Sequence, residues 1–349
     1  MINISANING IRYAPFLCRK LHTFNISELS EALSKEATFI LRVDNKNQIA
    51  MSWWVSAKRT RSYPYTRIYD SLSFSGKKLT VIPIVKDEGK EGDRDFLQWD
   101  TVSLMSLLGV YVIIGYYNTA ERSQRYRHKI TNQRFDIDYI KTEIRQLLSY
   151  QSDALHWNLS RIDKIGKIGE NALESYQKIS KKLKVEMHSW NSAEKRINQL
   201  LRGKTEFMKL SREYAEQAQK REGMTVQPKE RLSGTKAVIT ITNYLGGCYY
   251  FTSDEVEIKD DRIYLVEGKH SKLGSLPSLE DIKDGLLKML LFSNLEDVKI
   301  GSKKYNHVSM LKLTVAGGFK EQNLSESQKS NLDILRKEAQ TNNFKLNII

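Results

Sequence analysis

A carboxylate and an ammonium group stand two residues apart at the end of the apolar segment IYLVEGKHSK, which covers 263–272. Residues two apart on a strand project from the same face of its sheet, so Glu267 and Lys269 are predicted to stand together. Ile263 and Leu265 precede them on that face and are predicted to be buried. Because buried charges are costly without partners, this strand end is a candidate site.

A second carboxylate is predicted to lie beside this pair. If Lys259 pairs with Arg262 across a two-residue hairpin loop, Asp254 stands directly opposite Glu267, and their Cβ atoms are about 4.5 to 5.5 Å apart. Two carboxylates at this distance repel each other unless a cation lies between them. Hard oxygen ligands completed by water and phosphate suit Mg²⁺. The pattern therefore predicts Mg²⁺ held by Asp254 and Glu267, with Lys269 orienting the attacking water or offsetting negative charge.

The elements around this site are predicted to be strands and helices in a fixed order. Alternating apolar patterns and turn residues predict strands at 236–245, 249–258, 263–269 and 307–315. Ser278 is a suitable N-cap for a helix between the last two strands, with acidic residues in its first turn and an apolar stripe along it. With a first helix expected at about 191–222, the order is αβββαβ. The same register sends Glu255 to the opposite face of the sheet.

Asp254, a spacer, and Glu267-x-Lys269 at the end of a hydrophobic strand resemble the PD-(D/E)XK nuclease superfamily, which includes most type II restriction endonucleases. The resemblance covers about 191–315, although Ser253 stands where the motif has proline. It implies Mg²⁺-dependent hydrolysis of double-stranded DNA by in-line attack of water, without a covalent enzyme intermediate. In part of the superfamily a helix-borne Glu completes the metal site, and Glu222 or Glu230 are candidates for that role.

Two other interpretations of the acidic residues stay open. In the first, Asp254, Glu267 and Lys269 form a solvated ion-pair cluster at the end of a strand and have no catalytic role. A second acidic cluster contains Asp87, Glu88, Asp93 and Asp95, with Asp70 upstream. Because Ile84 occupies the position of the acid in its E-x-K pattern, this second cluster is predicted to be a loop with capping carboxylates.

Net charge indicates the class of partner. The 349 residues include 55 Lys plus Arg and 41 Asp plus Glu, a formal net charge of +14, which suits a polyanion such as nucleic acid. Two basic runs, at 58–67 and 122–129, supply candidate phosphate contacts. The DNA-binding residues predicted from them are Lys58, Arg59, Arg61, Arg67, Arg122, Arg125, Arg127 and Lys129. Asn132, Gln133 and Arg134 are side-chain types that read base edges, but no local pattern singles them out.

Composition favours a cytoplasmic protein, and the resemblance to restriction endonucleases implies a prokaryotic one. Only Cys18 and Cys248 occur, without neighbours at zinc-ligand spacing, which argues against zinc, against a disulfide framework and for a reducing compartment. The N-terminal segment MINISANING has no basic start before an apolar core, so no signal peptide is expected. The apolar stretch at 102–117 is shorter than the roughly 20 residues of a spanning helix, so no membrane association is expected.

The fold class predicted from these patterns is mixed α/β in three parts. Residues 1–120 are predicted to form an α/β unit that is a candidate for DNA recognition. Residues 121–222, which lack proline and carry apolar residues at helical spacing, are predicted to form a helical region that wraps DNA or mediates self-association. Residues 223–349 are predicted to hold the restriction-endonuclease-like αβββαβ core, together with the first helix at about 191–222.

The expected function is that of a type II restriction endonuclease that cuts double-stranded DNA at a specific sequence. Host DNA would be protected by a cognate DNA methyltransferase, and a symmetric target site favours a homodimer. One alternative is a repair, recombination or mobile-element nuclease with the same core. The other alternative is a non-catalytic basic DNA-binding protein in which the cluster of Asp254, Glu267 and Lys269 is structural.

Overall fold

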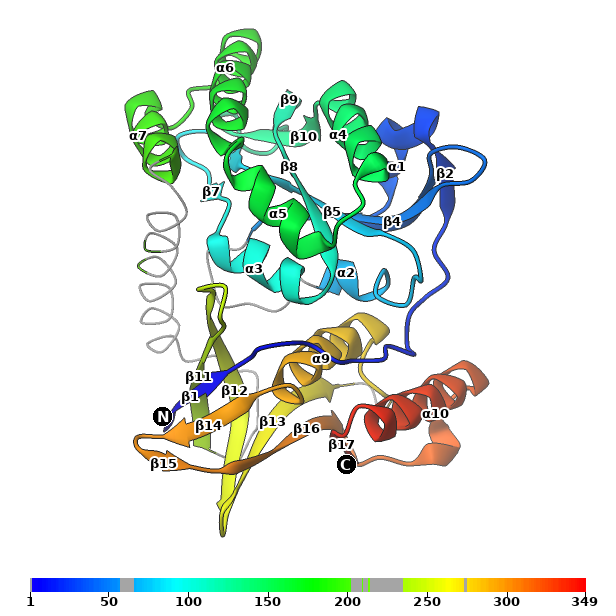
Figure 1. The fold of residues 1–349 in the computed structure, drawn as a ribbon. Coiled ribbons are helices and arrows are strands. Elements are labelled where there is room, and N and C mark those ends of the chain that lie inside the picture. The colour runs from blue at the N-terminus through cyan, green and yellow to red at the C-terminus, as the bar shows by residue number, and fades with distance from the viewer. Residues whose placement is uncertain (1, 57–65, 202–208, 210–212, 214–234, 273–274) are drawn as a thin grey trace. The chain divides into compact units, whose positions relative to one another are not determined.

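The computed structural model describes residues 2–56, 66–201, 209, 213, 235–272 and 275–349. The protein is mixed α/β, as predicted, and contains two compact units that alternate along the chain (Figure 1). Among the described residues, unit 1 contains 2–20, 66–73 and those within 235–349, and unit 2 contains 21–56 and 74–201.

Unit 1 is built on an eight-stranded sheet with the order β15-β14-β1-β11-β12-β13-β16-β17. Its strands are β1 (Ile2–Asn7), β11 (Thr235–Thr242), β12 (Cys248–Lys259), β13 (Arg262–Ser271), β14 (Glu296–Ile300), β15 (Lys303–Lys304), β16 (Asn306–Val315) and β17 (Lys345–Ile348). Strands β11, β12 and β13 are antiparallel neighbours, whereas β16 runs parallel to β13. The three consecutive strands predicted from the sequence are confirmed.

The helices of unit 1 are α2 (Thr66–Tyr69), α9 (Leu279–Phe292) and α10 (Glu326–Thr341), with a 3₁₀ turn, η3 (Glu321–Asn323). Ser278 caps α9 as predicted, because its Oγ accepts a hydrogen bond from the backbone N of Asp281 at 3.1 Å. Helix α9 contacts β13 and β16, and Leu286, Met289 and Leu290 are buried along it. The helix therefore covers the strand that carries Glu267 and Lys269.

Unit 2 contains a five-stranded sheet with the order β2-β3-β4-β5-β8, and two hairpins, β6–β7 and β9–β10. The strands are β2 (Thr23–Asn25), β3 (Thr38–Arg42), β4 (Gln48–Trp53), β5 (Lys78–Pro83), β6 (Val85–Asp87), β7 (Arg94–Phe96), β8 (Val110–Gly115), β9 (Tyr117–Arg122) and β10 (Ile130–Phe135). Its helical segments are η1 (Ile26–Glu28), α1 (Leu29–Lys35), α3 (Trp99–Leu107), α4 (Ile137–Ser149), α5 (Ala154–Ile162), α6 (Ile165–Leu183) and α7 (Trp190–Leu201). Helices α3, α4, α5 and α6 contact β8, whose apolar residues are buried as its sequence predicts.

The unit boundaries differ from the predicted divisions at 120 and 222. Strand β1 belongs to the sheet of unit 1, where it pairs in parallel with β11, and its Ile4 and Ala6 are buried. A pairing across more than 200 residues leaves no local signal in the sequence. The predicted helical region at 121–222 also begins with strand structure, because it contains the end of β9, the hairpin turn and β10 before α4 starts.

The helix expected at about 191–222 is also placed differently. Helix α7 covers its first part and groups with unit 2, where Ala193 and Ile197 pack against Leu173 of α6. Most of the remainder lies outside the described residues. Strands β14 and β15 lie between α9 and β16 in the chain. The observed order of elements therefore differs from the predicted αβββαβ order.

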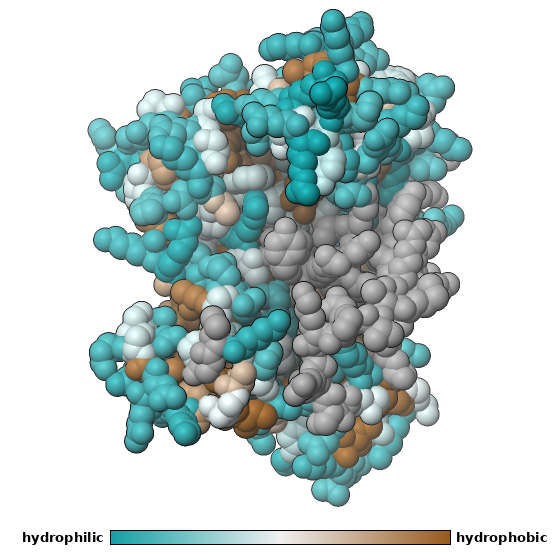
Figure 2. Space-filling view, turned by 180° about the vertical axis from the view of Figure 1, so that it is seen from behind, coloured by the Kyte–Doolittle hydropathy of each residue, from teal (hydrophilic) through white to brown (hydrophobic). Residues whose placement is uncertain are grey.

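Within the described parts of the chain, no helix is long and apolar enough to cross a membrane. On the face drawn in Figure 2, hydrophilic side chains predominate and hydrophobic ones lie in small separate groups. The described large hydrophobic side chains with substantial exposure are Tyr126, Tyr244, Ile258 and Ile349. Tyr126 lies in the turn of the basic hairpin.

Candidate active site

Glu267 and Lys269 stand together on one face of β13, as predicted. The Nζ of Lys269 lies 2.9 Å from Oε1 of Glu267. Ile263 and Leu265, which precede them on that face, are fully buried, and Glu267 itself is only 2% exposed. The predicted burial of the residues that precede the charged pair is thus confirmed, and the carboxylate of Glu267 lies inside unit 1.

Helix α9 adds a carboxylate and an ammonium group to this pair. Lys288 places its Nζ 2.6 Å from Oε2 of Glu267 and donates a second hydrogen bond to the carbonyl of Thr252 at 3.0 Å. Lys269 donates to Oδ2 of Asp284. Asp284 and Lys288 are four residues apart and therefore share one face of α9. The sequence analysis considered the cap, the acidic first turn and the apolar stripe of this helix but not Asp284 and Lys288, although the four-residue spacing of these opposite charges is a signal for them.

Gly285 lets α9 approach the sheet closely at this point. A Cβ atom at Gly285 would lie 2.6 Å from Cδ1 of Leu311 and 3.4 Å from Cε of Lys269. Because the contact with Leu311 is too short for a real Cβ atom, a larger residue at this position would force Leu311 or the helix to shift. The glycine thus allows Asp284 and Lys288 to reach the charges on β13.

Asp254 lies at a bulge in β12. The pairing between β11 and β12 shifts register between Thr235 and Ala237, whose partners are Val256 and Ser253. The shift leaves one extra residue in β12. Bulges of this kind redirect side chains and are common beside active sites. The position of Asp254 therefore depends on an irregularity that alternating sequence patterns do not reveal.

A hydrogen bond to the backbone of β13 holds the carboxylate of Asp254 near Glu267 and Lys269. Its Oδ2 accepts a hydrogen bond from the backbone N of Gly268 at 2.9 Å. The predicted pairing of Lys259 with Arg262 is confirmed, but the ladder ends at Glu255–Val266, one pair before the predicted partnership of Asp254 with Glu267. The three predicted residues are nevertheless brought together.

A matched ion pair occupies the opposite face of the same strands. Glu255 points away from Glu267, as predicted, and its Oε2 lies 3.0 Å from Nζ of Lys312 on β16. Lys312 is the partner of Gly268 in the pairing of β13 with β16. Position 268 alternates with Glu267 along the strand, so it lies on the opposite face of the sheet. This partly buried pair provides a control for the charges at the candidate site.

The environment shifts the pKa values of the buried charges. Burial, together with the nearby carboxylate of Asp254, raises the pKa of Glu267 to about 7, although Lys288 and Lys269 oppose the rise. Burial favours a lower pKa for Lys269, but the carboxylates of Glu267 and Asp284 outweigh it and hold that pKa above its ordinary value. The pKa of Lys288 is raised for the same reason, by Glu267 and Asp254 against burial. The ammonium groups thus stay charged while Glu267 titrates near neutral pH.

Asp254 and Glu267 have the chemistry of a two-carboxylate site for a hard divalent cation. Repulsion from Asp254 contributes to the raised pKa of Glu267, and a cation between the two groups would relieve it. No group of three or more His, Cys, Asp or Glu side chains among the described residues is arranged to hold a metal ion. Few protein ligands, with water and phosphate completing the shell, are typical of Mg²⁺. The donor set therefore fits Mg²⁺.

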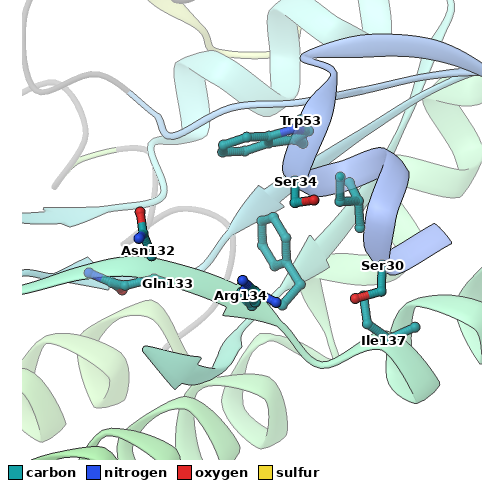
Figure 3. A pocket seen from close by; sticks show the side chains of 9 residues that line it. Ser30, Ser34, Trp53, Asn132, Gln133, Arg134 and Ile137 are labelled. Atoms are coloured by element: carbon teal, nitrogen blue, oxygen red, sulfur yellow. The ribbon is translucent and has the colours of Figure 1, made fainter. Parts of the chain in front are cut away.

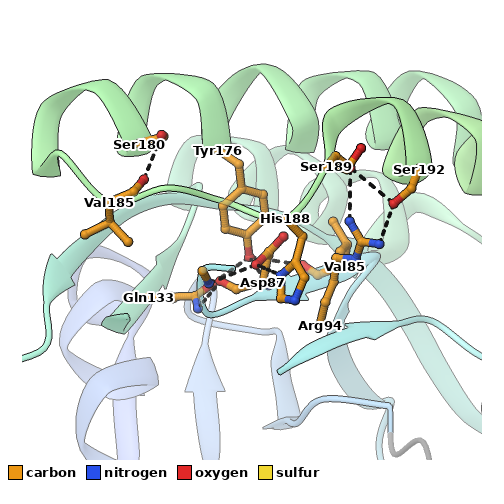
Figure 4. Close-up of polar contacts among 11 residues, drawn as sticks. Val85, Asp87, Arg94, Gln133, Tyr176, Ser180, Val185, His188, Ser189 and Ser192 are labelled. Atoms are coloured by element: carbon orange, nitrogen blue, oxygen red, sulfur yellow. Dashed lines mark hydrogen bonds and ion pairs between the residues drawn. The ribbon is translucent and has the colours of Figure 1, made fainter. Parts of the chain in front are cut away.

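The second acidic cluster forms a hydrogen-bond network in unit 2 (Figure 4). Oδ1 of Asp87 accepts from the backbone N of Gly89 at 2.9 Å and lies 2.8 Å from Nδ1 of His188. The backbone N of Asp87 donates to the hydroxyl of Tyr176, which in turn donates to Oε1 of Gln133 at 2.6 Å. Asp87 stabilises its loop in this way, as the capping interpretation predicted.

Asp70, the upstream member of that cluster, belongs to unit 1. Its Oδ1 lies 2.8 Å from Nζ of the buried Lys283, and its Oδ2 lies 3.3 Å from Nε of Arg19. Asp70 and Asp87 thus each have their own partners within their own unit.

The predicted DNA-binding residues fall into three groups. Arg122, Arg125, Arg127 and Lys129 lie on the β9–β10 hairpin of unit 2, and Arg67 lies on α2 of unit 1. The cations of Arg125 and Lys129 lie 5.3 and 5.4 Å from the ring centroid of Tyr126. Lys58, Arg59 and Arg61, and the additional acids Glu222 and Glu230, lie outside the described residues. Comparisons of the chain with protein-family models, curated proteins and solved structures find no match.

Proposed function

We propose that this protein is a Mg²⁺-dependent endonuclease that hydrolyses double-stranded DNA, of the type II restriction class. The observation that carries the proposal is the convergence of Asp254, Glu267 and Lys269 on the face of β13 that α9 covers. These residue types supply two metal-binding carboxylates and a cation, which are the groups that phosphodiester hydrolysis needs.

The strand arrangement also supports the proposal. Three antiparallel strands, β11 to β13, are followed by α9 and by β16 parallel to β13. This is the βββαβ part of the order that the PD-(D/E)XK resemblance implies, with the motif residues on the second and third strands. Strands β1, β14, β15 and β17 extend the sheet at both of its edges.

The residues have distinct roles in the proposed reaction. Asp254 and Glu267 would hold Mg²⁺, which supplies polarisation of the phosphodiester and a lowered pKa of bound water. Lys288 keeps Glu267 available as a carboxylate, because its ammonium group opposes the effect of burial on the pKa of Glu267. Lys269, held between Glu267 and Asp284, is placed to orient the water or to stabilise negative charge that develops on the phosphate.

The partners follow from the same proposal. A net charge of +14 and the basic β9–β10 hairpin favour contacts to DNA phosphates. Cleavage of both strands of a symmetric site favours a homodimer, and protection of host DNA requires a cognate methyltransferase in the same prokaryotic cytoplasm. A repair, recombination or mobile-element nuclease with the same core would cut branched or nicked DNA instead.

One observation favours a different function, a non-catalytic basic DNA-binding protein. Both carboxylate oxygens of Glu267 already have ammonium partners, and Glu267 is almost fully buried. A cluster of this kind also stabilises the packing of a helix on a sheet without any catalysis. Such a protein would bind DNA equally well with and without Mg²⁺.

Incubation of the purified protein with unmethylated phage DNA in Mg²⁺ tests the proposal. Glu267→Gln and Lys269→Met should abolish cleavage while the folded variants still bind DNA. The matched controls, Glu255→Gln and Lys312→Met, alter a similar ion pair on the opposite face and should still cut. Discrete fragments support the restriction class, and selective cutting of branched DNA supports the repair class. Unchanged cutting by Glu267→Gln, or DNA binding without cutting on any substrate, would contradict the proposed active site.

A further inference from the structure

Unit 2 contains a pocket that includes none of the proposed nuclease residues (Figure 3). It has a volume of about 320 Å³ and lies among α1, the end of β4 and the junction of β10 with α4. Its walls include Ser30, Ser34, Trp53, Asn132, Arg134 and Phe135. Pockets for small ligands span roughly 300 to 1,000 Å³, so this one suits a single flat ring system.

Two aromatic side chains form one wall of the pocket. The rings of Trp53 and Phe135 meet edge to face, with centroids 6.2 Å apart and an angle of 81° between their planes. Nε1 of Trp53 donates a hydrogen bond to the carbonyl of Glu36 at 2.9 Å, which fixes the orientation of the indole. A fixed, partly exposed aromatic ring is a suitable surface for stacking of a planar ligand.

Polar groups for recognition of a ligand edge come from β10. Asn132 donates from Nδ2 to Oε2 of Glu121 at 2.7 Å, and this bond uses only the nitrogen of its amide. The side chain of Arg134 is 59% exposed, and its Nη2 forms an ion pair with Oε1 of Glu121 at 3.8 Å, a distance longer than a hydrogen bond. The amide oxygen of Asn132 and the N–H groups of Arg134 therefore provide an acceptor and donors at the pocket.

Gln133 has a different role from its two neighbours. Its Nε2 donates to the carbonyl of Asp87 at 2.8 Å, and its Oε1 accepts from the hydroxyl of Tyr176 at 2.6 Å. Both ends of its amide are thus used within the protein (Figure 4). Gln133 holds β10 in place, whereas Asn132 and Arg134 have hydrogen-bonding groups available at the pocket.

The β9–β10 hairpin supplies positive charge on the same structural element. Its turn carries Arg125, Arg127 and Lys129, and the exposed Tyr126 lies among them. A ligand that satisfies both the pocket and the hairpin combines a flat ring, a hydrogen-bonding edge and an attached phosphate. Nucleic acid bases in a strand have this combination.

We propose that this pocket binds one nucleobase of DNA, stacked on the ring of Trp53 beside Phe135 and recognised at its edge by Asn132 and Arg134. A base can enter such a pocket from a single strand or by extrusion from a duplex. A free nucleotide has the same base chemistry, but the several cations of the hairpin favour a strand with several phosphates. This role goes beyond the proposed cleavage and is tested without metal.

Photo-crosslinking in EDTA tests the proposal with the full-length protein. The probes are a single-stranded oligonucleotide and a duplex, each with one 5-iododeoxyuridine, and the crosslinked peptide is identified by mass spectrometry. The wild type should crosslink at Trp53 or Phe135. Asn132→Gly combined with Arg134→Ala should lower that yield at least roughly fivefold. Glycine is chosen at Asn132 because the backbone there has a φ of 47°, which glycine adopts without strain.

Asn45→Ala combined with Arg145→Ala is the matched control, because both residues are exposed in unit 2 and line no part of the pocket. It should crosslink like the wild type. If 5-iododeoxyuridine monophosphate reaches Trp53 or Phe135 while neither DNA probe does, the base-binding role stands with a free nucleotide as its source. Crosslinks only at other residues, such as Tyr126, or an unchanged yield in the pocket variant, would overturn the proposal.

Discussion

Lys288 on α9 and Glu267 on β13 form a buried ion pair, with 2.6 Å between Nζ and Oε2. The pair joins the helix to the strand that carries the candidate active site. Because burial favours the neutral form of Glu267, the ammonium of Lys288 opposes burial and limits the rise of this pKa to about 7. Packing of the helix and chemistry of the site thus depend on one contact.

Replacement of Lys288 should therefore affect both stability and cleavage. Lys288→Met leaves Glu267 with Lys269 as its remaining ammonium partner and should lower the free energy of unfolding at pH 8 by about 3 kcal/mol. The loss should be smaller at pH 5.5, where Glu267 is protonated. Lys288→Arg, which retains the charge, should be milder. Denaturant titrations of the two variants and the wild type at both pH values measure this, and an equal loss at both would contradict the role of charge.

The pKa of Glu267 predicts a pH dependence of stability in metal-free buffer. Its folded-state pKa of about 7 is raised above the ordinary value of 4.5, so the folded protein holds a proton that the unfolded chain releases between these values. The stabilisation from this proton is complete below about pH 4.5 and is lost as pH rises through 7. Glu267→Gln cannot titrate, so its free energy of unfolding should rise relative to wild type over this window.

Chemical denaturation at several pH values between 4.5 and 8 checks this expectation. Glu174→Gln, at an exposed position on α6, is the control and should follow the wild-type pH profile. Parallel profiles for wild type and Glu267→Gln would mean that Glu267 has an ordinary pKa. The result does not depend on the proposed catalytic role, because no metal or DNA is present.

The sequence predicts much of the local structure around the site. The Lys259–Arg262 register, the Ser278 cap and the common face of Glu267 and Lys269 all follow from turn chemistry, capping and strand alternation, and the structure agrees. These features depend on residues that are close in the sequence. Short-range physics is sufficient for them.

Long-range features were not predictable in the same way. The bulge that places Asp254 and the pairing of β1 with β11 depend on contacts between distant segments. Asp284 and Lys288 become members of the site only when α9 packs on β13, which Gly285 allows. The sequence alone therefore indicated the strand-borne residues of the site and omitted those on the helix.

Glu338 on α10 provides a test of how the N-terminal segment is held in unit 1. Its buried carboxylate accepts hydrogen bonds from the hydroxyls of Tyr13 and Tyr69 and from the backbone N atoms of Phe16 and Leu17. Glu338→Gln replaces one acceptor oxygen with a donor and should lower the free energy of unfolding by at least about 2 kcal/mol. Tyr13→Phe removes one of the four bonds and should cost about 1 kcal/mol.

Thermal or denaturant unfolding of these variants measures the effect. Gln328→Glu keeps the acceptor that the backbone N of Ser325 uses in the first turn of the same helix, so it is a control for a charge change on α10 and should alter stability by less than about 1 kcal/mol. Equal stability of Glu338→Gln and wild type would show that the four hydrogen bonds do not hold residues 13–17 in solution.

The turn of the β9–β10 hairpin should contribute to DNA affinity through phosphate contacts. Combined replacement of Arg125, Arg127 and Lys129 by Gln should weaken binding and reduce its dependence on salt. Each lost phosphate contact lowers the slope of log affinity against log salt by about 0.9 on duplex DNA, so a decrease of up to roughly 2.7 is expected. Arg122 is left unchanged because its Nε donates to the carbonyl of Arg127 and supports the turn.

Fluorescence anisotropy with a labelled duplex, measured across a series of salt concentrations, gives this slope. Replacement of Lys167, Lys178 and Lys182 on α6 by Gln changes the net charge equally and serves as the control. If both triple variants lose the same slope, the effect reflects net charge and not the hairpin. A selective loss in the hairpin variant assigns the phosphate contacts to the element that also carries Asn132 and Arg134, and so places phosphate binding beside the proposed base pocket.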